Sequence, residues 1–347
     1  MLNSAENFQM GIGCLSKDTE LLTPRGWLSI TQVTHITPVA QYFLSHQMGF
    51  INFTTPSCLS SGIVEKAYNI TNTDGHVDQL IANHHSILFA TDNNKAIVKP
   101  INDKTDYRSK IITGGYMYGS PDISLSVSER IRIAIQADGA IKKQSTNTDI
   151  VVFRLKKADK LERAKMLLAQ NGAEYRVYPS RTDGCIHFVF SSSPGYYEKD
   201  FDWIDLSMVN LQWCRNFIEE ISYWDSTIRK NNGVRNNHIQ YFNNRKLAID
   251  RVQAIAVLSG YRTCLSGRDR MPGLWNESYT LSISDNRGVL SEVVTKTLVD
   301  YNDYMYTVGV PSGFLITRRN NCVSVVPTHS VSSPYVVGDL ILNACPV

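Results

Sequence analysis

The chain has 347 residues with 35 Lys+Arg, 32 Asp+Glu and 8 His, for a formal net charge of +3. This length accommodates two hydrophobic cores, and no uncharged apolar run reaches the roughly 20 residues that span a bilayer. The N-terminus lacks the basic-then-apolar order of a signal peptide, so we expect an intracellular protein, cytoplasmic or nuclear, without a membrane partner. The seven cysteines show no zinc-ligand or redox spacing, which disfavours a disulfide framework and a structural zinc site.

Short strands are expected in the first third of the chain. Residues 14–115 alternate β-branched and aromatic runs with Gly, Pro, Asn and Asp turns, which is typical of an all-β segment. A Gly- and Ser-rich junction at 112–124 then precedes amphipathic helical patterns. After residue 290 strand patterns return, joined by Pro-Ser-Gly and Asn-Asn turns. The simplest reading is one β domain interrupted by a second domain.

The middle of the chain repeats one α/β pattern. Helices are expected at roughly 125–138 and 159–171, and again at 212–225 and 246–259, with strand-like runs beside them. Such a repeat predicts a pseudo-symmetric pair of half-domains. Residues 120–290 carry 24 Lys+Arg and 19 Asp+Glu, whereas the rest of the chain carries 11 and 13. The basic middle favours a polyanionic partner, with ordinary scatter of surface charge as the alternative.

Cys14 is the first residue with candidate chemistry. It follows Gly13, which leaves the preceding peptide bond open to approach, and it begins a run that contains Asp18-Thr19-Glu20 and a Gly26-Trp27 strand. This run resembles the start of an intein. The resemblance implies that the Cys14 sulfur attacks the carbonyl carbon of residue 13, whereas a lone cysteine is otherwise a small buried apolar residue.

His85 lies in a strand-like Ala82-Asn83-His84-His85 run. The run resembles the intein block Thr-x-x-His, with Ala82 where Thr is usual, and implies that His85 polarises the peptide bond before Cys14. Loss of the Thr hydroxyl removes a hydrogen-bond donor, which is expected to slow this step rather than forbid it. Two strand histidines without a chemical role are the alternative.

The tail resembles the last two intein blocks, which normally close with His-Asn and a downstream nucleophile. His329 and Ser330 form an altered junction here, with His329 either as the penultimate His or in place of the Asn. No side-chain amide is present, so no succinimide can form, and we expect cleavage at Cys14 rather than complete splicing. Asn321-Cys322 is an alternative junction, ranked second because a chain ending there loses the return strand of a hairpin.

Two segments of the middle resemble the signature motifs of LAGLIDADG homing endonucleases. They are IRIAIQADGAI, residues 131–141, and FIEEISYWDST, residues 217–227. The resemblance implies that two helices pack face to face and that Asp138 and Asp225, beside Gly139 and Ser226, bind divalent metal over the scissile phosphates. Mg²⁺ is the expected ion, and Mn²⁺ or Ca²⁺ can replace it in binding. A single Asp-Gly helix stop has a structural explanation, but two in a repeated unit favour catalysis.

The two segments also depart from the LAGLIDADG pattern. Gln136 and Tyr223 replace the acidic residue before the terminal Asp, and Ser226 replaces Gly. Trp224 is bulky for a tight helix interface. These departures concern the helix interface more than metal binding.

Basic residues on or near the expected β ribbons are candidates for DNA contacts. They are Arg154, Lys156, Lys157, Arg176 and Arg181 in the first half, and Arg229, Lys230, Arg235, Arg245 and Lys246 in the second. Arg and Lys beside Asn, Gln and Tyr suit phosphate contacts and base readout in the major groove. A solvated charged face is the alternative for any one of them.

The expected fold is an all-β Hint-type (intein) splicing domain interrupted by an α/β pseudo-two-fold LAGLIDADG endonuclease domain. The expected parts are an extein remnant at 1–13, a splicing domain at 14–118 and 291–330, an endonuclease domain at 119–290 with halves 119–205 and 206–290, and a second remnant at 331–347. The expected function is a monomeric, site-specific endonuclease that cuts a long asymmetric site in double-stranded DNA, with host exteins in cis. A catalytically decayed DNA-binding or self-cleaving protein and a regulatory DNA-binding protein are the alternatives.

Overall fold

The computed structural model describes most of the chain between residues 14 and 339. The described ranges are 14–72, 75–91, 95–103, 110–119, 123–142, 149–192, 199–231, 234–268, 278–284, 289–291 and 294–339. Side chains at 229–231, 234–237, 268 and 289–291 are outside the description.

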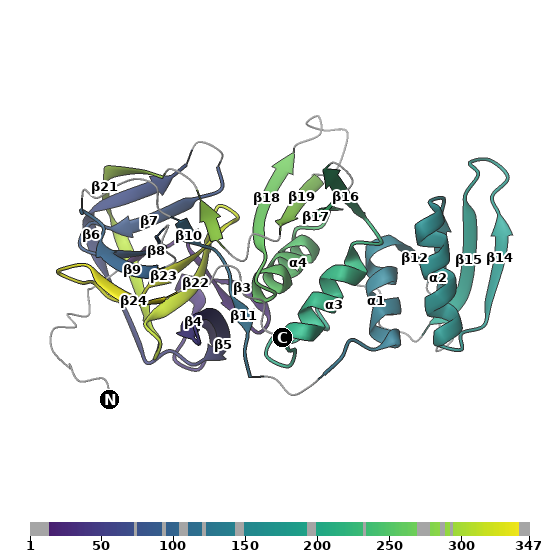
Figure 1. The fold of residues 1–347 in the computed structure, drawn as a ribbon, viewed down its shortest axis with the longest axis horizontal. Helices are drawn as coiled ribbons and strands as arrows, with labels where there is room; N and C mark the ends of the chain where they lie inside the picture. The colour runs from purple at the N-terminus through teal and green to yellow at the C-terminus, as the bar shows by residue number, and fades with distance from the viewer. Residues whose placement is uncertain are drawn as a thin grey trace.

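Strands from the first and last parts of the chain pair with one another. The first set is β1 (Leu15–Ser16), β2 (Glu20–Thr23), β3 (Gly26–Ser29), β4 (Val39–Ser45), β5 (Met48–Thr54), β6 (Cys58–Thr71), β7 (Asp78–Ala82), β8 (Ser86–Ala90), β9 (Lys95–Pro100), β10 (Lys110–Ile112) and β11 (Tyr116–Met117), with a 3-10 turn at Ile30–Gln32. The last set is β20 (Val289–Ser291), β21 (Thr295–Gly309), β22 (Phe314–Arg319), β23 (Cys322–Pro327) and β24 (Tyr335–Asp339). We call both sets together the β region (Figure 1).

Pairing across the sequence closes the β region. β1 and β6 both pair with β21, β2 pairs with β22, and β9 pairs with β24, all antiparallel. Leu15, Leu21, Ile81, Val308 and Leu315 belong to one buried core that both sets of strands share. Because alternate residues of a strand face one side, these apolar positions form a continuous interior.

The middle of the chain consists of two units with one element order, helix-strand-strand-helix-strand-strand. Unit one contains α1 (Val127–Asp138), β12 (Gly139–Lys142), β13 (Asp149–Leu155), α2 (Ala158–Gln170), β14 (Tyr175–Pro179) and β15 (Ile186–Ser192). Unit two contains α3 (Leu211–Ile221), β16 (Ser226–Asn231), β17 (Val234–Asn243), α4 (Lys246–Leu258), β18 (Arg262–Arg268) and β19 (Ser278–Ser284). Their sheets have the orders β12-β13-β15-β14 and β16-β17-β19-β18, so the topology repeats.

Local sequence signals explain where the first helix of each unit starts. Ser126 and Glu129 form a capping box at α1, with a hydrogen bond in each direction. The Asn210 side chain accepts from the Trp213 amide at the start of α3. α1 ends at Asp138, and Gly139 follows it. An added Cβ at Gly139 would lie 2.8 Å from the Ile135 carbonyl oxygen, so only glycine fits this tight turn into β12.

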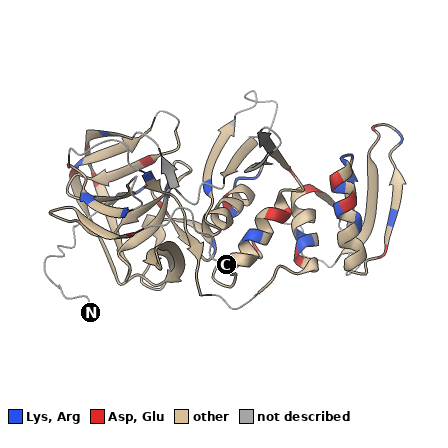
Figure 2. Ribbon diagram, viewed as in Figure 1, with Lys and Arg blue, Asp and Glu red and all other residues tan. Residues whose placement is uncertain are grey.

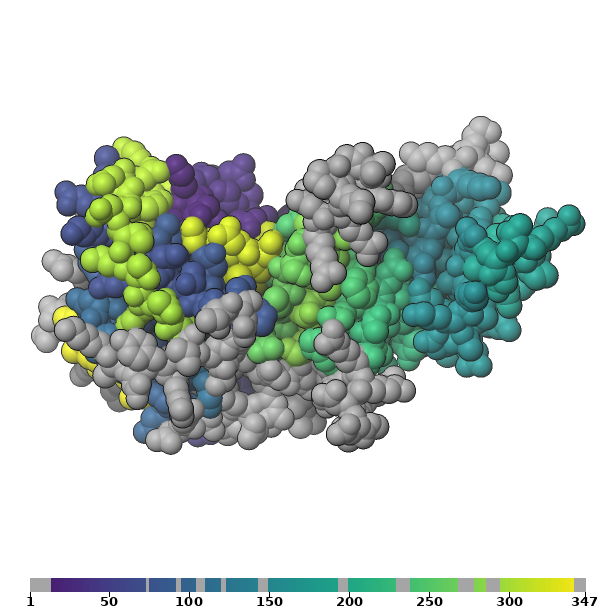
Figure 3. Space-filling model, turned by 90° about the horizontal axis from the view of Figure 1, so that it is seen from above, coloured from purple at the N-terminus to yellow at the C-terminus, as the bar shows by residue number. Residues whose placement is uncertain are grey.

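The molecule is elongated, with the β region at one end and unit one at the other (Figures 1 and 3). α1 and α3 pack together where the two units meet, and α4 lies between the sheet of unit two and the β region. Charged residues of both signs are interleaved on α1, α2 and α3 (Figure 2). None of the helices in the described residues is long and apolar enough to cross a bilayer.

A buried arginine joins unit two to the β region. Arg318 on β22 is 2% exposed, its guanidinium donates to Glu20 Oε1 and Oε2 at 2.8 and 2.6 Å, and its Nη1 lies 2.5 Å from Asp250 Oδ1 on α4. Gln253 on α4 also donates to the Asn321 carbonyl at 2.9 Å. Polar groups from three elements are thereby satisfied in one buried cluster.

The expected fold class is wrong. It assigned the first and last strands to a Hint-type domain and the middle to an α/β LAGLIDADG domain, whereas about half of the described residues are strand, alongside four α-helices. Eight of the strands, β12–β19, form the sheets of the middle units. The β-branched and aromatic runs there pair with one another, and short motifs do not determine how such runs assemble.

Candidate active site

The two predicted carboxylates occupy corresponding positions of the two units. Asp138 is the last residue of α1. Asp225 follows α3 after a turn at 222–224 and directly precedes β16. Each carboxylate therefore lies where the first helix of its unit gives way to the first strand.

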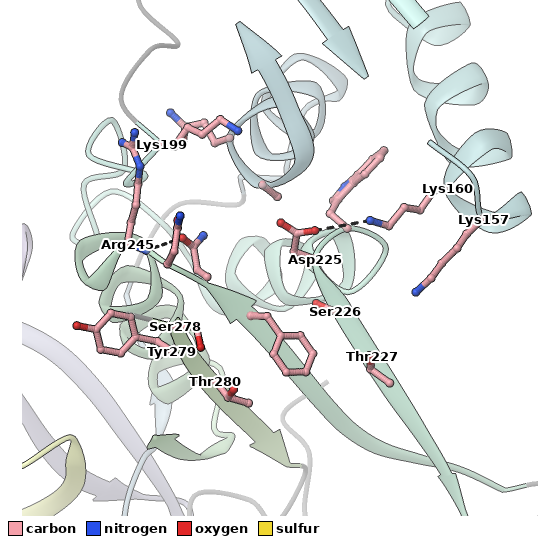
Figure 4. Close-up of a pocket in the computed structure, with 16 residues that line it drawn as sticks. Lys157, Lys160, Lys199, Asp225, Ser226, Thr227, Arg245, Ser278, Tyr279 and Thr280 are labelled. Carbon is pink, nitrogen blue, oxygen red and sulfur yellow. Dashed lines mark hydrogen bonds and ion pairs between the residues drawn. The ribbon is translucent and has the colours of Figure 1, made fainter. Parts of the chain in front are cut away.

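Lys160 brings the two carboxylates into one site. It lies in the first turn of α2, its ammonium makes an ion pair with Asp138 Oδ2, and its Nζ is 3.8 Å from Asp225 Oδ1. The lysine side chain is only 13% exposed. Figure 4 shows the Lys160 ammonium directed at the Asp225 carboxylate, while Lys157 extends away from it. One cation thus contacts a carboxylate from each unit.

The charges at the site perturb one another. The pKa of Asp225 is raised to about 6, first by burial and then by the charge of Asp138, while Lys160 and Lys199 oppose the shift. Burial also lowers the pKa of Lys199, against the attraction of both carboxylates. Closely placed titratable groups whose pKa values are shifted in this way are typical of functional sites.

A cavity of about 640 Å³ lies beside Asp225. Its wall includes residues of both units and four cations, Lys157, Lys160, Lys199 and Arg245. Phe242 and Tyr279 add aromatic surface from the second sheet. A carboxylate within a ring of cations suits a phosphate ester, because the cations offset its negative charge.

The residues that depart from the LAGLIDADG pattern have partners at the interface of the units. Gln136 Oε1 accepts a hydrogen bond from Trp203 Nε1 at 3.0 Å. Trp224 is fully buried, its Nε1 donates to Glu220 Oε1 at 3.1 Å, and its ring stacks on Phe153 of unit one with centroids 5.6 Å apart. The bulk of Trp224 therefore fills the interface.

Glu220 ties three helices together behind the site. It is fully buried on α3 and accepts from Arg130 Nη1 of α1 at 3.0 Å and from Arg163 Nε of α2 at 3.2 Å. Arg163 also packs over the Tyr223 ring. Since Arg163 lies one turn after Lys160, the cluster fixes the end of α2 that carries the lysine.

The other two predicted metal residues have structural partners. Gly139 begins β12 and its amide donates to the Ile135 carbonyl. Ser226 lines the cavity, and its hydroxyl donates to the Ile221 carbonyl at 3.1 Å.

The two carboxylates suit a divalent cation that takes its other ligands from substrate and water, rather than a cation held entirely by protein side chains. Within the part of the chain that the structure describes, no three His, Cys, Asp or Glu side chains are arranged to hold a metal ion. Mg²⁺ commonly binds one or two carboxylates and takes its remaining ligands from substrate phosphates and water. The Lys160 ammonium against both carboxylates is a stand-in ion, which marks the position as favourable for a cation.

The predicted DNA-contact residues fall into different environments. Arg154 on β13 is exposed but makes an ion pair with Asp183, and Arg176 on β14 is exposed. Arg245 lines the cavity, whereas Lys246 turns to Asp250 at 2.5 Å, within the cluster around Arg318. Lys156, Lys157 and Arg181 are exposed. The side chains of Arg229, Lys230 and Arg235 lie outside the described residues.

Sequence reasoning missed Lys160 and Lys199. Lys160 is 22 residues from Asp138 in the sequence, and Lys199 follows β15, so neither adjoins a motif. The Lys156-Lys157 pair before α2 was the available signal, because it placed basic residues at the start of the helix that carries Lys160.

Cys14 lies in a second buried site, within the β region. It is 2% exposed, Thr307 Oγ1 donates to its sulfur at 3.3 Å, and the Ala82 amide donates to its carbonyl oxygen at 3.0 Å. His85 follows in the same turn, since its amide donates to the Ala82 carbonyl. Cys14 and His85 are therefore both hydrogen-bonded to Ala82, whereas Gly13 lies outside the described residues.

The His85 ring is buried beside the start of the tail. Its Nε2 lies 2.8 Å from the Pro327 carbonyl oxygen, and Nδ1 has no hydrogen-bond partner within the described residues. Burial lowers the pKa of His85 to about 4, so the ring is neutral at physiological pH.

The predicted junction residues divide between two places. His329 is half-buried near His85, with Nε2 2.9 Å from the Tyr335 hydroxyl, and its pKa is lowered first by burial and then by His85. The Ser330 hydroxyl is buried without a hydrogen-bond partner in the described part of the chain. Asn321 lies in the turn between β22 and β23, and burial raises the pKa of Cys322 to about 12.

The chain resembles one curated protein across most of its length. It is 25% identical over 349 residues to the ribonucleoside-diphosphate reductase subunit beta of Aquifex aeolicus (strain VF5), and the match covers 90% of this chain. The match spans 49%, about half, of that relative. This relative is named as a reductase subunit, not a Hint-type intein, which also contradicts the expected fold class. No protein-family model matches the chain.

Solved structures that resemble part of the chain include LAGLIDADG proteins. I-DmoI in complex with DNA and Mn is 16% identical, with a TM-score of 0.33, over 46% of this chain and 89% of that one. The N-terminal LAGLIDADG domain of WhiA is 12% identical, with a TM-score of 0.33, over 47% and 80%. I-DmoI complexes were also solved with Mg and with Ca. None of these proteins is named as an intein.

Proposed function

We propose that the chain is a metal-dependent endonuclease that makes a site-specific break in double-stranded DNA. The observation that carries this proposal is the convergence of Asp138 and Asp225, from two units of one topology, on a single ammonium. Two carboxylates that meet at one cation are suitable protein ligands for a divalent metal that assists phosphodiester hydrolysis.

The chain's own residues divide the work of this reaction. Asp138 and Asp225 would hold Mg²⁺, which supplies Lewis-acid activation of a phosphate oxygen and of water when bound. Lys157, Lys199 and Arg245 line the cavity and bind the negative phosphates. Trp224 and Glu220, both buried, hold the two units in register beneath the carboxylates.

The two sheets offer surfaces for a long duplex. Ile150, Val152 and Arg154 alternate with buried residues along β13 and face away from the helices. Thr227, Phe242 and Thr280 of the second sheet line the cavity, so that sheet continues from the carboxylate. Since the two faces differ in composition, we propose a long asymmetric target bound by a monomer through residues 119–290, with halves 119–205 and 206–290.

Digestion of the reconstructed insertion-site DNA with Mg²⁺ tests the proposal. The DNA joins the coding sequences of residues 1–13 and 331–347, the two expected extein remnants. Asp138→Asn and Asp225→Asn should each lower double-strand cleavage by at least about a thousandfold and leave specific binding in place. Full cleavage by either variant would overturn the two-carboxylate assignment, and salt-independent DNA binding would contradict the phosphate contacts.

A second candidate activity is self-cleavage before Cys14, and the Cys14 surroundings favour it. The thiolate would attack the carbonyl carbon of residue 13, form a thioester and release the Cys14 nitrogen as an amine, so the acyl group moves from N to S. Thr307 contacts the sulfur, and the free Nδ1 of the neutral His85 ring is available to the released amine. In this proposal residues 1–13 and 331–347 belong to flanking host sequence, and His329-Ser330 is an altered junction.

Mass spectrometry with and without added thiol tests the second activity. Thiol should release residues 1–13 from the wild-type chain, and Cys14→Ser and His85→Ala should suppress the release. Val33→Ala, another substitution in the same core, is the matched control. An intact mass in thiol at every time point would leave no support for this activity.

A further inference from the structure

Lys160 occupies the position at which a bound metal would meet both carboxylates. Its ammonium pairs with Asp138 and lies 3.8 Å from Asp225, although no sequence motif marks it. The side chain is 13% exposed, so the pair is shielded from water on most sides. Burial of this kind strengthens the attraction between the ammonium and the carboxylates.

The two carboxylates need a cation to lie side by side. The Lys160 ammonium makes an ion pair with Asp138 Oδ2 and lies 3.8 Å from Asp225 Oδ1, so one cation faces both carboxylates. Uncompensated like charges in a partly buried site repel, so without Lys160 the metal-free protein would hold two carboxylates that repel each other. Lys160 therefore performs the charge compensation that a divalent ion would perform.

The lysine has both an anchor and room to move. Arg163, one turn later on α2, is held by the buried Glu220, which fixes the helix itself. The Lys160 stem is four flexible carbons long, and its side chain lines the 640 Å³ cavity together with Lys157. The ammonium can therefore leave the carboxylates for the cavity without any movement of α2.

We propose that Lys160 is a resident counter-ion that competes with the divalent metal for Asp138 and Asp225. In metal-free protein it holds the carboxylates together, and on metal binding its ammonium moves into the cavity, where DNA phosphate provides a new partner. Metal affinity is therefore low without DNA and higher with DNA. This inference rests on the proposed metal-dependent nuclease.

Calorimetric titration of DNA-free protein with Ca²⁺ measures the competition directly. Lys160→Met should bind Ca²⁺ about tenfold more tightly than wild type, and Ca²⁺ should raise its melting temperature by more. Lys160→Arg keeps the charge and should bind Ca²⁺ as weakly as wild type. Lys165→Met, an exposed position on the same helix, is the matched control and should change nothing.

The outcomes separate this inference from the nuclease itself. Unchanged or weaker Ca²⁺ affinity in folded Lys160→Met, checked by circular dichroism, overturns the counter-ion role even when the variant no longer cuts DNA, because lost cleavage alone indicates a direct catalytic role. Tighter binding by Lys160→Arg also overturns it. Wild-type protein that binds Ca²⁺ but cuts no DNA contradicts the nuclease proposal and leaves the competition standing.

Discussion

Units one and two share a topology but lie in different surroundings. Three of the 13 residues of α2 are buried, against ten of 13 in α4. α2 covers one face of its sheet and is open to solvent, whereas α4 lies between its sheet and the β region (Figure 1). The same topology therefore accepts very different helix sequences, because the number of buried faces on a helix decides how many apolar residues that helix needs.

The units also differ in what holds them. Unit one meets unit two through Glu220, Arg130 and Arg163, and this cluster lies directly behind the carboxylates. Unit two meets the β region through the ion pair between Asp250 and Arg318. Substitutions can therefore test the two joints separately.

The largest effect is expected at the joint between the units. Glu220→Gln leaves Arg130 and Arg163 without their buried carboxylate and should lower the free energy of unfolding by about 4 kcal/mol. Urea denaturation measures the change. Glu219→Gln, at the neighbouring position on α3, is the control, and an equal loss there would show that the Glu220 cluster has no special weight.

The second-largest effect is expected at the contact between unit two and the β region. Arg318→Met leaves Glu20 and Asp250 without their guanidinium, and we expect a loss of about 3 kcal/mol. Lys17→Met removes the exposed pair with Asp303 in the same region and should cost far less. Two separate unfolding transitions in the Arg318 variant would show that this residue couples the parts, and a single unshifted transition would contradict its role.

The third effect concerns pH at the carboxylates. A pKa of about 6 for Asp225 means that Ca²⁺ binding should fall about tenfold per pH unit below pH 6. The effect of pH on the stability of the metal-free protein has the opposite sign. The folded pKa lies above the reference value of 3.8, so this carboxyl stabilises metal-free protein most below pH 4, and that contribution is lost as the pH rises through 6. Affinity that is flat from pH 5 to 8 would count against the shifted pKa.

The smallest effect is expected on the open face of unit one. Arg154→Met removes an exposed ion pair with Asp183 and should change stability by less than about 0.5 kcal/mol. The same change should weaken DNA binding and reduce the salt dependence by about one counter-ion. Binding measured at several salt concentrations checks this, with Lys165→Met as the control.

Local order was largely predictable, whereas assembly was not. The helices expected at 125–138, 159–171 and 246–259 agree with α1, α2 and α4 to within two residues at either end. The helix expected at 212–225 stops at Ile221, because residues 222–224 turn to bring Asp225 to the first strand. The expected fold class, a Hint-type domain interrupted by a LAGLIDADG domain, was wrong, since propensity locates strands but does not choose their partners.

The sequence by itself determined the repeated element order, the two carboxylates at helix ends and the Cys14 and His85 pair as candidates, because these depend on local pattern and spacing. Only the tertiary structure decided that Lys160 lies between Asp138 and Asp225, that Lys199 shares the cavity that Asp225 lines, and that Arg318 joins unit two to the β region. These contacts link residues from 22 to 298 positions apart. Such distant groups meet only after the sheets and helices have packed, which no local pattern records.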